Sequence, residues 1–293
     1  MFELGVESMW QAIWNALPLA LLAATPLLLA VEGELVVQRS GIINLGIEGM
    51  MLVAAMTAVL AAQATHSAAI GFLGGIGGAL LVALLFGIFA IALKADQIVT
   101  GTAINLLAVG VTSFVYQELR AGDIFVSSIP KLSFDFIVPL AWIVFPILLA
   151  LLLWNTTLGL RMRACGENPE AVAATGSSIA MHRALALVIE AIAAGLSGAY
   201  LSLGLSSGFA ENMTAGRGFI ALSIVIFGRW KLKGVLLGTA IFGLAAALQY
   251  ALQASNTGVP YHLLLAVPYF VTLLILCGIA GRVRAPQSLG RSS

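Results

Sequence analysis

The chain carries too little charge to cover a water-soluble surface. Only 9% of its 293 residues are charged, whereas soluble domains carry about 25%. Apolar runs of roughly 18 residues or more recur along the chain, and such runs need a low-dielectric solvent. In a bilayer only helices or closed barrels satisfy every backbone polar group, and these runs do not alternate as barrel strands would. The composition therefore predicts an all-α, polytopic transmembrane helical bundle.

Other scarcities exclude further classes of protein. The net charge is only +1 and no segment forms a basic domain, so nucleic-acid binding is not expected. The phosphate-binding motif GxxxxGK[ST] and the catalytic motifs HExxH and GxSxG are absent. Cys165 and Cys277 have no CxxC partner and no nearby His in ligand spacing. The chain is therefore predicted to be no enzyme, to hold no metal or cofactor, and to carry two inert thiols.

The apolar runs predict one membrane domain over residues 1–293. We expect about nine spans, with eight to ten as the limits, because each run is long enough to cross the hydrocarbon. The predicted spans are 9–31, 42–62, 68–93, 98–118, 138–158, 183–206, 214–228, 234–253 and 262–280.

Orientation follows from the basic residues, because cytoplasmic loops carry the excess of Lys and Arg. Between the predicted spans, eleven of the fourteen basic residues share one side. They are Arg39, Lys94, Arg161, Arg163, Arg183, Arg229, Lys231, Lys233, Arg282, Arg284 and Arg291, against Arg120, Lys131 and Arg217 on the other side. This predicts an N-out, C-in arrangement with a cytoplasmic loop at 159–183 and a cytoplasmic tail at 281–293 that acts as a positive anchor.

Two apolar segments are not expected to form straight helices that cross the whole membrane. Residues 218–228 would give about 16 Å of helix against roughly 30 Å of hydrocarbon, so we expect a half-helix joined to irregular backbone from Gly208 to Gly218. Residues 41–51, GIINLGIEGMM, contain three glycines, Asn44 and Glu48, and should also break. Aligning 41–47 with 218–224 gives four matches in seven. This suggests a weak inverted repeat, although chance matches are common in so apolar a chain.

The polar segment 159–183 is predicted to contain a short docking helix. Asn168 can cap a helix, Pro169 suits the first helical position, and Glu170 lies near the positive end of the helix dipole. Gly176 then favours a stop. A helix of about two turns is marginal alone in water. We therefore interpret this segment as a contact for a second protein.

Polar side chains inside the predicted spans are candidates for a transport pathway. We place two carboxylates within spans, Glu48 and Glu190, and each would cost about 2.5 to 3.5 kcal/mol near the bilayer centre. Each therefore needs a polar partner or a water-filled cavity, and for Glu48 that partner could be the amides of a broken helix. Asn105 could present its amide to a solute or form an interhelical hydrogen bond. Both the structural and the pathway role remain open for these residues.

Four segments in order resemble a known family. The chain is similar to the permease subunits of bacterial ABC importers in the branched-chain amino acid and simple sugar group, and most similar to the shorter permease of the purine nucleoside type. The segments are RSGIINLGIEGMML at 39–52, ADQIVTGTAINLLA at 95–108, GENPEAVAATG at 166–176 and ENMTAGRGFIALSIVIFGRW at 211–230. One departure is Gly176-Ser177-Ser178-Ile179, where family members often have Gly-Ile or Gly-Val directly after the coupling helix.

The resemblance implies a set of partners and a location. It implies a cytoplasmic ATP-binding subunit that holds ATP and Mg²⁺, a second and longer permease, an extracytoplasmic substrate-binding protein, and the bacterial inner membrane. It also places Asn44, Glu48 and Asn105 near the translocation path. The residues that it assigns to ATPase coupling are Glu167, Asn168, Pro169, Glu170 and Ala171.

Three functional hypotheses follow. The first is a permease subunit of an ATP-driven importer for a nucleoside or a simple sugar-like solute. The second is a proton-coupled secondary transporter that uses Glu48 or Glu190, which would transport alone and stop with an uncoupler. The third is a scaffold subunit, which would tolerate apolar replacements at the polar positions of its spans.

Overall fold

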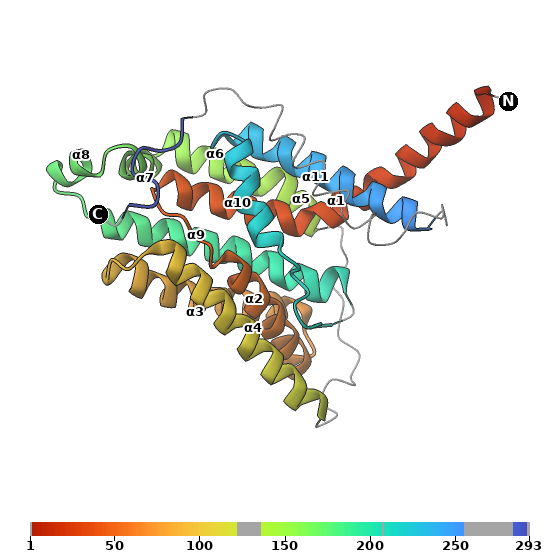
Figure 1. Cartoon of the computed structure of the whole chain (residues 1–293), viewed down its shortest axis with the longest axis horizontal. Helices are drawn as coiled ribbons and strands as arrows, with labels where there is room; N and C mark the ends of the chain where they lie inside the picture. Colours follow the sequence, from red (N-terminus) through yellow and green to blue (C-terminus); the bar gives the residue numbers. More distant parts are fainter. Residues whose placement is uncertain (1, 122–135, 207, 255–283, 292–293) are drawn as a thin grey trace.

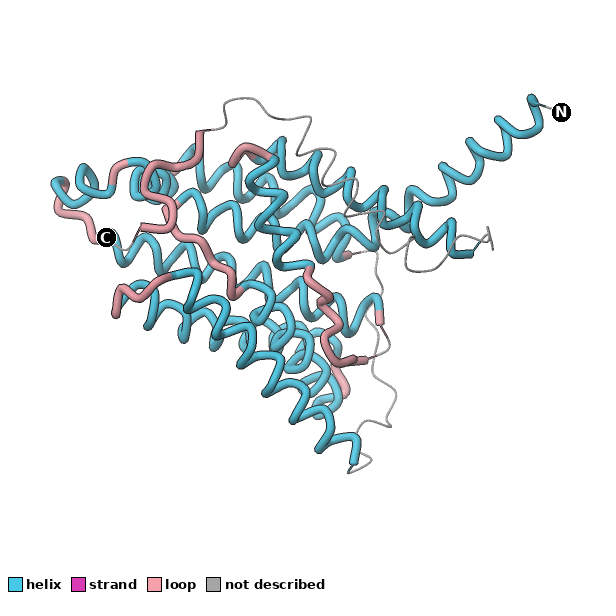
Figure 2. Tube along the Cα trace, in the orientation of Figure 1, coloured by secondary structure: helices cyan, strands magenta, loops and turns pink. Residues whose placement is uncertain are grey.

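The computed structural model describes residues 2–121, 136–206, 208–254 and 284–291. Within these residues all regular structure is helical (Figures 1 and 2), which confirms the predicted fold class. The helices are α1 (Phe2–Arg39), α2 (Ile47–Thr65), α3 (Ala68–Gly87), α4 (Gln97–Ala121), α5 (Ile137–Pro139), α6 (Phe145–Asn155), α7 (Thr157–Glu167), α8 (Pro169–Ala174), α9 (Ile179–Ala199), α10 (Arg217–Phe227) and α11 (Leu232–Ala254), with π-helical turns η1 (Ile88–Ala92), η3 (Leu140–Val144) and η4 (Tyr200–Leu205).

Six of the described helical segments are long and apolar enough to cross a membrane. They are Ala20–Arg39, Ile47–Thr65, Ala68–Ala92, Gln97–Ala121, Ile137–Asn155 and Ile179–Leu205, and shorter apolar helices follow at Arg217–Phe227 and Leu232–Ala247. The predicted span 262–280 lies outside the described residues. The chain is therefore a polytopic membrane bundle, while the number of spans and their orientation stay predictions.

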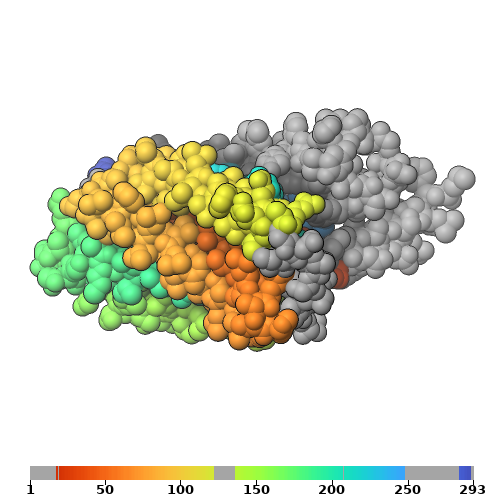
Figure 3. Space-filling model, turned by 90° about the horizontal axis from the view of Figure 1, so that it is seen from below, coloured from red at the N-terminus to blue at the C-terminus, as the bar shows by residue number. Residues whose placement is uncertain are grey.

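The bundle has a central layer and a rim. In an 18-residue apolar window of each membrane segment, 83% of the residues are buried in α1 and 67% in α2 and in α9 with η4, against 33% in α3 with η1 and in α4. Figure 3 views the face on which α3 and α4 lie beside α2. Large apolar side chains such as Leu81 and Leu106 remain about 70% exposed on this rim. A surface of this kind suits hydrocarbon rather than water.

The first membrane segment ends later than we predicted. We expected a span at 9–31, but α1 runs without a break to Arg39. Glu32 and Glu34 therefore lie inside the span and are fully buried. The expectation that only Glu48 and Glu190 lie within spans was wrong. A hydropathy pattern treats such charges as the end of a span, which is why the prediction stopped at residue 31.

Both predicted helix breaks are present. Residues 40–46 are not helical, and Gly41 has a φ of +93°, which a residue with a side chain rarely adopts. The half-helix α10 has 11 residues and follows non-helical backbone at 208–216. The proposed repeat does not pair equivalent backbone, however, because 41–46 is a loop whereas 218–224 is helical.

Several chain turns gather at one end of the bundle, where Figure 1 shows α7, α8 and the C-terminal segment. The side chain of Arg39, at the end of α1, donates a hydrogen bond of 2.8 Å to the carbonyl of Trp230 in the turn after α10. The amide of Ser288 donates to the carbonyl of Gly166 at the end of α7. Segments that are distant in sequence therefore meet beside α8.

Candidate functional site

Glu48 joins the two broken helices. It lies in the first turn of α2, and its carboxylate accepts hydrogen bonds from the amides of Gly216 at 2.8 Å and Gly218 at 2.6 Å. These amides belong to the N-terminus of α10, where the helix dipole favours a negative charge. Only 5% of Glu48 is exposed. The carboxylate thus satisfies backbone donors that the helix break leaves without partners, as the structural interpretation of Glu48 expected.

Asn105 supports the same region from α4. Its side-chain oxygen accepts a hydrogen bond of 2.8 Å from the amide of Gly49, and its side-chain nitrogen donates one of 2.7 Å to the carbonyl of Leu45. One side chain therefore holds backbone on both sides of the start of α2. Gly101, one turn earlier on α4, lies so close to this segment that a Cβ there would sit 2.7 Å from the amide nitrogen of Gly46.

Asn44 links the loop between α1 and α2 to α9. Its side-chain oxygen accepts from the amide of Gly46 at 2.9 Å, and its side-chain nitrogen donates to Glu190 at 2.6 Å. Asn44 and Glu190 are both fully buried. We name residues 40–46 the break loop. Asn44 connects this loop directly to α9, the helix that follows α8.

A second buried carboxylate, Glu34, extends this connection and was missed in the sequence. Glu34 lies within hydrogen-bonding range of Glu190 and accepts a bond of 2.8 Å from the side chain of Gln38. Gln38 in turn accepts a bond of 2.7 Å from the indole of Trp230. The spacing of Glu34 and Gln38, four residues apart on one helix, is the local signal that could have found this pair.

The three predicted pathway residues therefore come together around one feature. Asn44 and Glu48 lie in the break loop and in the first turn of α2, Asn105 bonds backbone in both, and each of the three side chains makes at least two hydrogen bonds. Their bonds place them as supports of the broken backbone. A direct contact between any of them and a solute stays a prediction.

The predicted docking helix is present as α8. The side chain of Asn168 accepts a hydrogen bond of 3.1 Å from the amide of Ala171, and Pro169 occupies the first helical position. Gly176 follows with a φ of +74°. Ser178 then caps α9 by accepting from the amide of Met181, so the departure from the family pattern supplies the start of the next helix.

The polar segment 159–183 is more helical than we expected. Helix α7 covers most of its first part, because Thr156 caps that helix by accepting from the amide of Gly159, and Met162 and Cys165 bury one face. Within the segment the non-helical residues are therefore only Asn168 and 175–178. Helix α8 projects between α7 and α9 at one end of the bundle (Figure 1).

The predicted coupling residues are accessible. Glu167, Asn168, Glu170 and Ala171 are exposed, and Pro169 is partly exposed, whereas Val172 is buried and anchors α8. A pocket of about 450 Å³ lies against this helix. We name it the α8 pocket; its lining residues are Glu167, Asn168, Pro169, Glu170, Ala173, Ile179, Gln287, Ser288 and Arg291.

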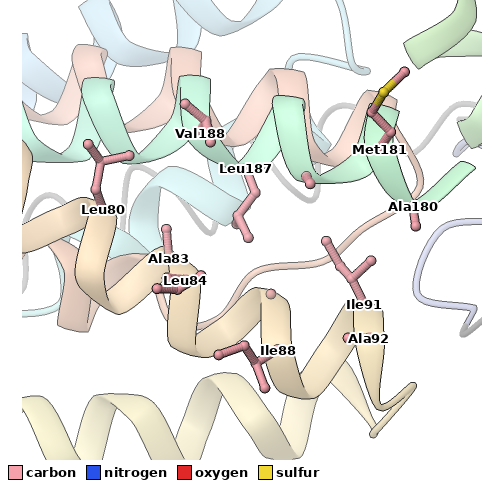
Figure 4. Close-up of a pocket in the computed structure, with 12 residues that line it drawn as sticks. Leu80, Ala83, Leu84, Ile88, Ile91, Ala92, Ala180, Met181, Leu187 and Val188 are labelled. Atoms are coloured by element: carbon pink, nitrogen blue, oxygen red, sulfur yellow. The ribbon is translucent and has the colours of Figure 1, made fainter. Parts of the chain in front are cut away.

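A second hollow, of about 560 Å³, lies between α3 with η1 and the start of α9. Figure 4 shows leucine, isoleucine, alanine and methionine side chains around it. All twelve lining residues are apolar. It therefore offers no side-chain hydrogen bond to a hydroxyl-bearing solute, and it is not a candidate for the solute site.

Cys165 is a buried thiol on α7. Burial raises the pKa of this thiol, and the neighbouring charge of Arg183 offsets part of that shift. A thiol of this kind is a poor nucleophile at neutral pH, in line with the predicted inert role. Cys277 lies outside the described residues. Within the described residues no three His, Cys, Asp or Glu side chains are grouped so as to hold a metal ion.

Comparisons with known sequences agree with the family resemblance of the four sequence segments. The sequence model of the branched-chain amino acid transport system / permease component family matches residues 15–276. The chain is 32% identical to the guanosine ABC transporter permease protein NupQ of Bacillus subtilis, with 93% of this chain and 94% of that protein covered. No solved structure gives a significant match.

Two further relatives carry related names. The nucleoside ABC transporter permease protein NupC of Lactococcus lactis is 31% identical, over 92% of this chain and 93% of that protein. The putative glucose ABC transporter permease protein TsgC13 of Haloferax volcanii is 36% identical, over 79% of this chain and 76% of that protein. On the match to the family over most of its length, the chain belongs to the branched-chain amino acid transport system permease component family.

Proposed function

We propose that the chain is a membrane-spanning permease subunit of an ATP-driven ABC importer, and that it forms half of the translocation path for a nucleoside or simple sugar-like solute. The observation that carries the proposal is α8, a capped helix with exposed carboxylates at one end of an otherwise apolar bundle. The names of the relatives support the transport class and favour nucleosides. They also favour the importer over a proton-coupled carrier that would use Glu48 or Glu190.

The proposal assigns the energy source to other subunits. A cytoplasmic ATP-binding subunit would hold ATP and Mg²⁺, a second and longer permease would complete the path, and an extracytoplasmic binding protein would deliver the solute. The assembly would lie in the bacterial inner membrane, with the residues of α8 on the cytoplasmic side. ATP binding would then favour one of two arrangements of the permease pair.

The contacts of the break loop suggest how movement at α8 reaches the path. Helix α9 follows α8 after only four residues, and Glu190 on α9 bonds Asn44 in the break loop. The break loop leads into α2, whose Glu48 holds the N-terminus of α10. A shift of α8 would therefore reach both broken helices through side chains that are already bonded.

Charge reversal at the docking helix tests the proposal. Replacing Glu167 and Glu170 with Arg in the assembled transporter should abolish solute uptake while ATP hydrolysis loses its response to solute. The two side chains are exposed, so insertion and folding should be preserved. Glu118→Arg is the matched control, because Glu118 is an exposed carboxylate on α4. Unchanged uptake in the double variant would contradict a docking role for α8.

A further inference from the structure

The C-terminal segment is built into the docking region. Ser288 is only 3% exposed, and its hydroxyl donates to the carbonyls of Cys165 at 2.7 Å and Gly166 at 2.8 Å. Its backbone amide also donates to the Gly166 carbonyl at 2.9 Å. A basic tail that served only as a membrane anchor would need none of these bonds. We name residues 286–291 the tail strap.

The tail strap also holds the break loop. The amide of Gly290 donates a hydrogen bond of 3.0 Å to the carbonyl of Gly41. Leu289 packs against the hydrophobic core, and Ile42, the residue after Gly41, is a member of that core. The strap therefore binds the last turn of α7 and the break loop at the same time.

The strap, the end of α7 and the break loop pack closely at Gly41, Gly166 and Ser288. A Cβ at Gly41 would sit 2.7 Å from the hydroxyl of Ser288, and a Cβ at Gly166 would sit 2.2 Å from the carbonyl of Arg39. Cβ atoms do not approach other atoms so closely without displacing them. The strap, α7 and the break loop thus meet without free space between them.

The strap forms one wall of the α8 pocket. Gln287, Ser288 and Arg291 line it from the strap, opposite Glu167, Asn168, Pro169 and Glu170 around the start of α8. Gln287 and Arg291 are exposed. Any protein that docks on α8 and fills this pocket must touch the strap as well.

We propose that the tail strap is a part of the ATPase docking site, and that it passes the position of the docked subunit directly to the break loop. This inference rests on the proposed function of α8 as the docking helix. It adds a second route to the one through α9. The first route runs through Glu190 and Asn44, and the second through Ser288 and Gly290.

The lining of the pocket indicates what it receives. Pro169, Ala173 and Ile179 supply apolar surface, and the charged side chains of the lining are two carboxylates, Glu167 and Glu170, and one cation, Arg291. A long basic side chain combines an apolar stem with a charged head. The occupant is therefore a Lys or Arg of the ATPase subunit, with its stem on the apolar surface and its head near the carboxylates.

The strap is tested in the complete transporter reconstituted in lipid vesicles. One variant ends at Arg284 and lacks the strap, and its matched control ends at Arg291. The readouts are affinity for the ATPase subunit, solute-stimulated ATP hydrolysis, and maleimide labelling of Cys165 in a Cys277→Ser background. We expect the shorter chain to bind the ATPase at least tenfold more weakly, to lose stimulated hydrolysis, and to label faster at Cys165.

Two point variants keep the test independent of folding. Arg291→Glu changes one exposed side chain and should strengthen ATPase binding about 2- to 5-fold, the size of a typical surface charge effect. Glu170→Gln should weaken binding by a similar factor. Weaker binding with Arg291→Glu would overturn the basic occupant, and wild-type affinity and uptake in the chain that ends at Arg284 would overturn the strap. If the unaltered chain fails to bind the ATPase, the proposed function fails first.

Discussion

Replacing Glu48 measures what the junction between the broken helices contributes. Its carboxylate accepts two backbone hydrogen bonds, from Gly216 and Gly218, at the N-terminus of α10. Hydrogen bonds to charged groups contribute about 1.5 to 3 kcal/mol each. A favourable charge at a helix terminus adds roughly 0.3 to 1 kcal/mol, and up to about 2 kcal/mol where it is partly buried.

Glu48→Gln removes about half of this interaction. The amide oxygen of Gln can still accept from one backbone amide, but its NH₂ group faces the other donor and cannot accept. We expect a loss of about 2 kcal/mol, or a factor of about 30 in the folding equilibrium. Glu48→Ala removes both acceptors and should cost about 3 to 5 kcal/mol, because two backbone donors are then buried without partners.

Thermal unfolding of the purified chain in lipid nanodiscs, followed by solute uptake in the full transporter, measures both effects. The predicted order of stability is wild type, Glu48→Gln, then Glu48→Ala, with slowed uptake in Glu48→Gln while the ATPase stays bound. Glu118→Gln, on an exposed carboxylate of α4, should change neither quantity. If Glu48→Gln unfolds at the wild-type temperature and transports at the wild-type rate, the carboxylate does not hold the junction.

Three further predictions concern the same region. Asn105→Leu should lower the free energy of unfolding by about 2 to 4 kcal/mol, because both backbone groups that Asn105 bonds would lose their partners; an unchanged unfolding temperature would refute this. Burial raises the pKa of the Cys165 thiol, so a maleimide should label Cys165 slowly at pH 8 in the folded protein and rapidly after unfolding. The contribution of this thiol to the free energy of unfolding should be present below about pH 8.5 and decline above it, because the unfolded chain then loses the proton first. Equal labelling rates in the two states would be inconsistent with burial. Gly166→Ala should destabilise the protein strongly, since its Cβ would lie 2.2 Å from the carbonyl of Arg39. The control Gly77→Ala should be tolerated, because a Cβ there meets nothing within 4 Å. Similar unfolding temperatures for the two variants would count against the tight junction.

The features that sequence predicted correctly have local causes. The break at Gly41 reflects a backbone conformation that favours glycine, and the half-helix α10 is set by a short apolar run after irregular backbone. Helix α8 follows from a cap, a proline at the first position and a glycine after its end, all within nine residues. Each of these signals lies within the segment that it shapes, so a single sequence is enough to see it.

The features that sequence missed depend on contacts between distant segments. Glu34 was placed outside the first span, and the second carboxylate beside it, Glu190, lies on the distant helix α9. The bonds from Asn44 to Glu190 and from Gly216 to Glu48 join residues 146 and 168 positions apart. Ser288 has no local pattern that indicates a junction. Polar residues in an apolar chain therefore identified which side chains need partners, but the pairing required the packed bundle.

The polar partners of the helix breaks indicate what these breaks contribute to the permease. A continuous helix satisfies its own backbone and leaves no donors for a neighbour, whereas each break exposes amides that must find acceptors in a dry environment. Here Glu48, Asn105 and Asn44 supply the acceptors from α2, α4 and the break loop itself. Each break is thereby bonded to a different helix. Relative movement of those helices must strain or exchange these bonds, so the breaks are the positions where a displacement of α8 would change the interior of the bundle.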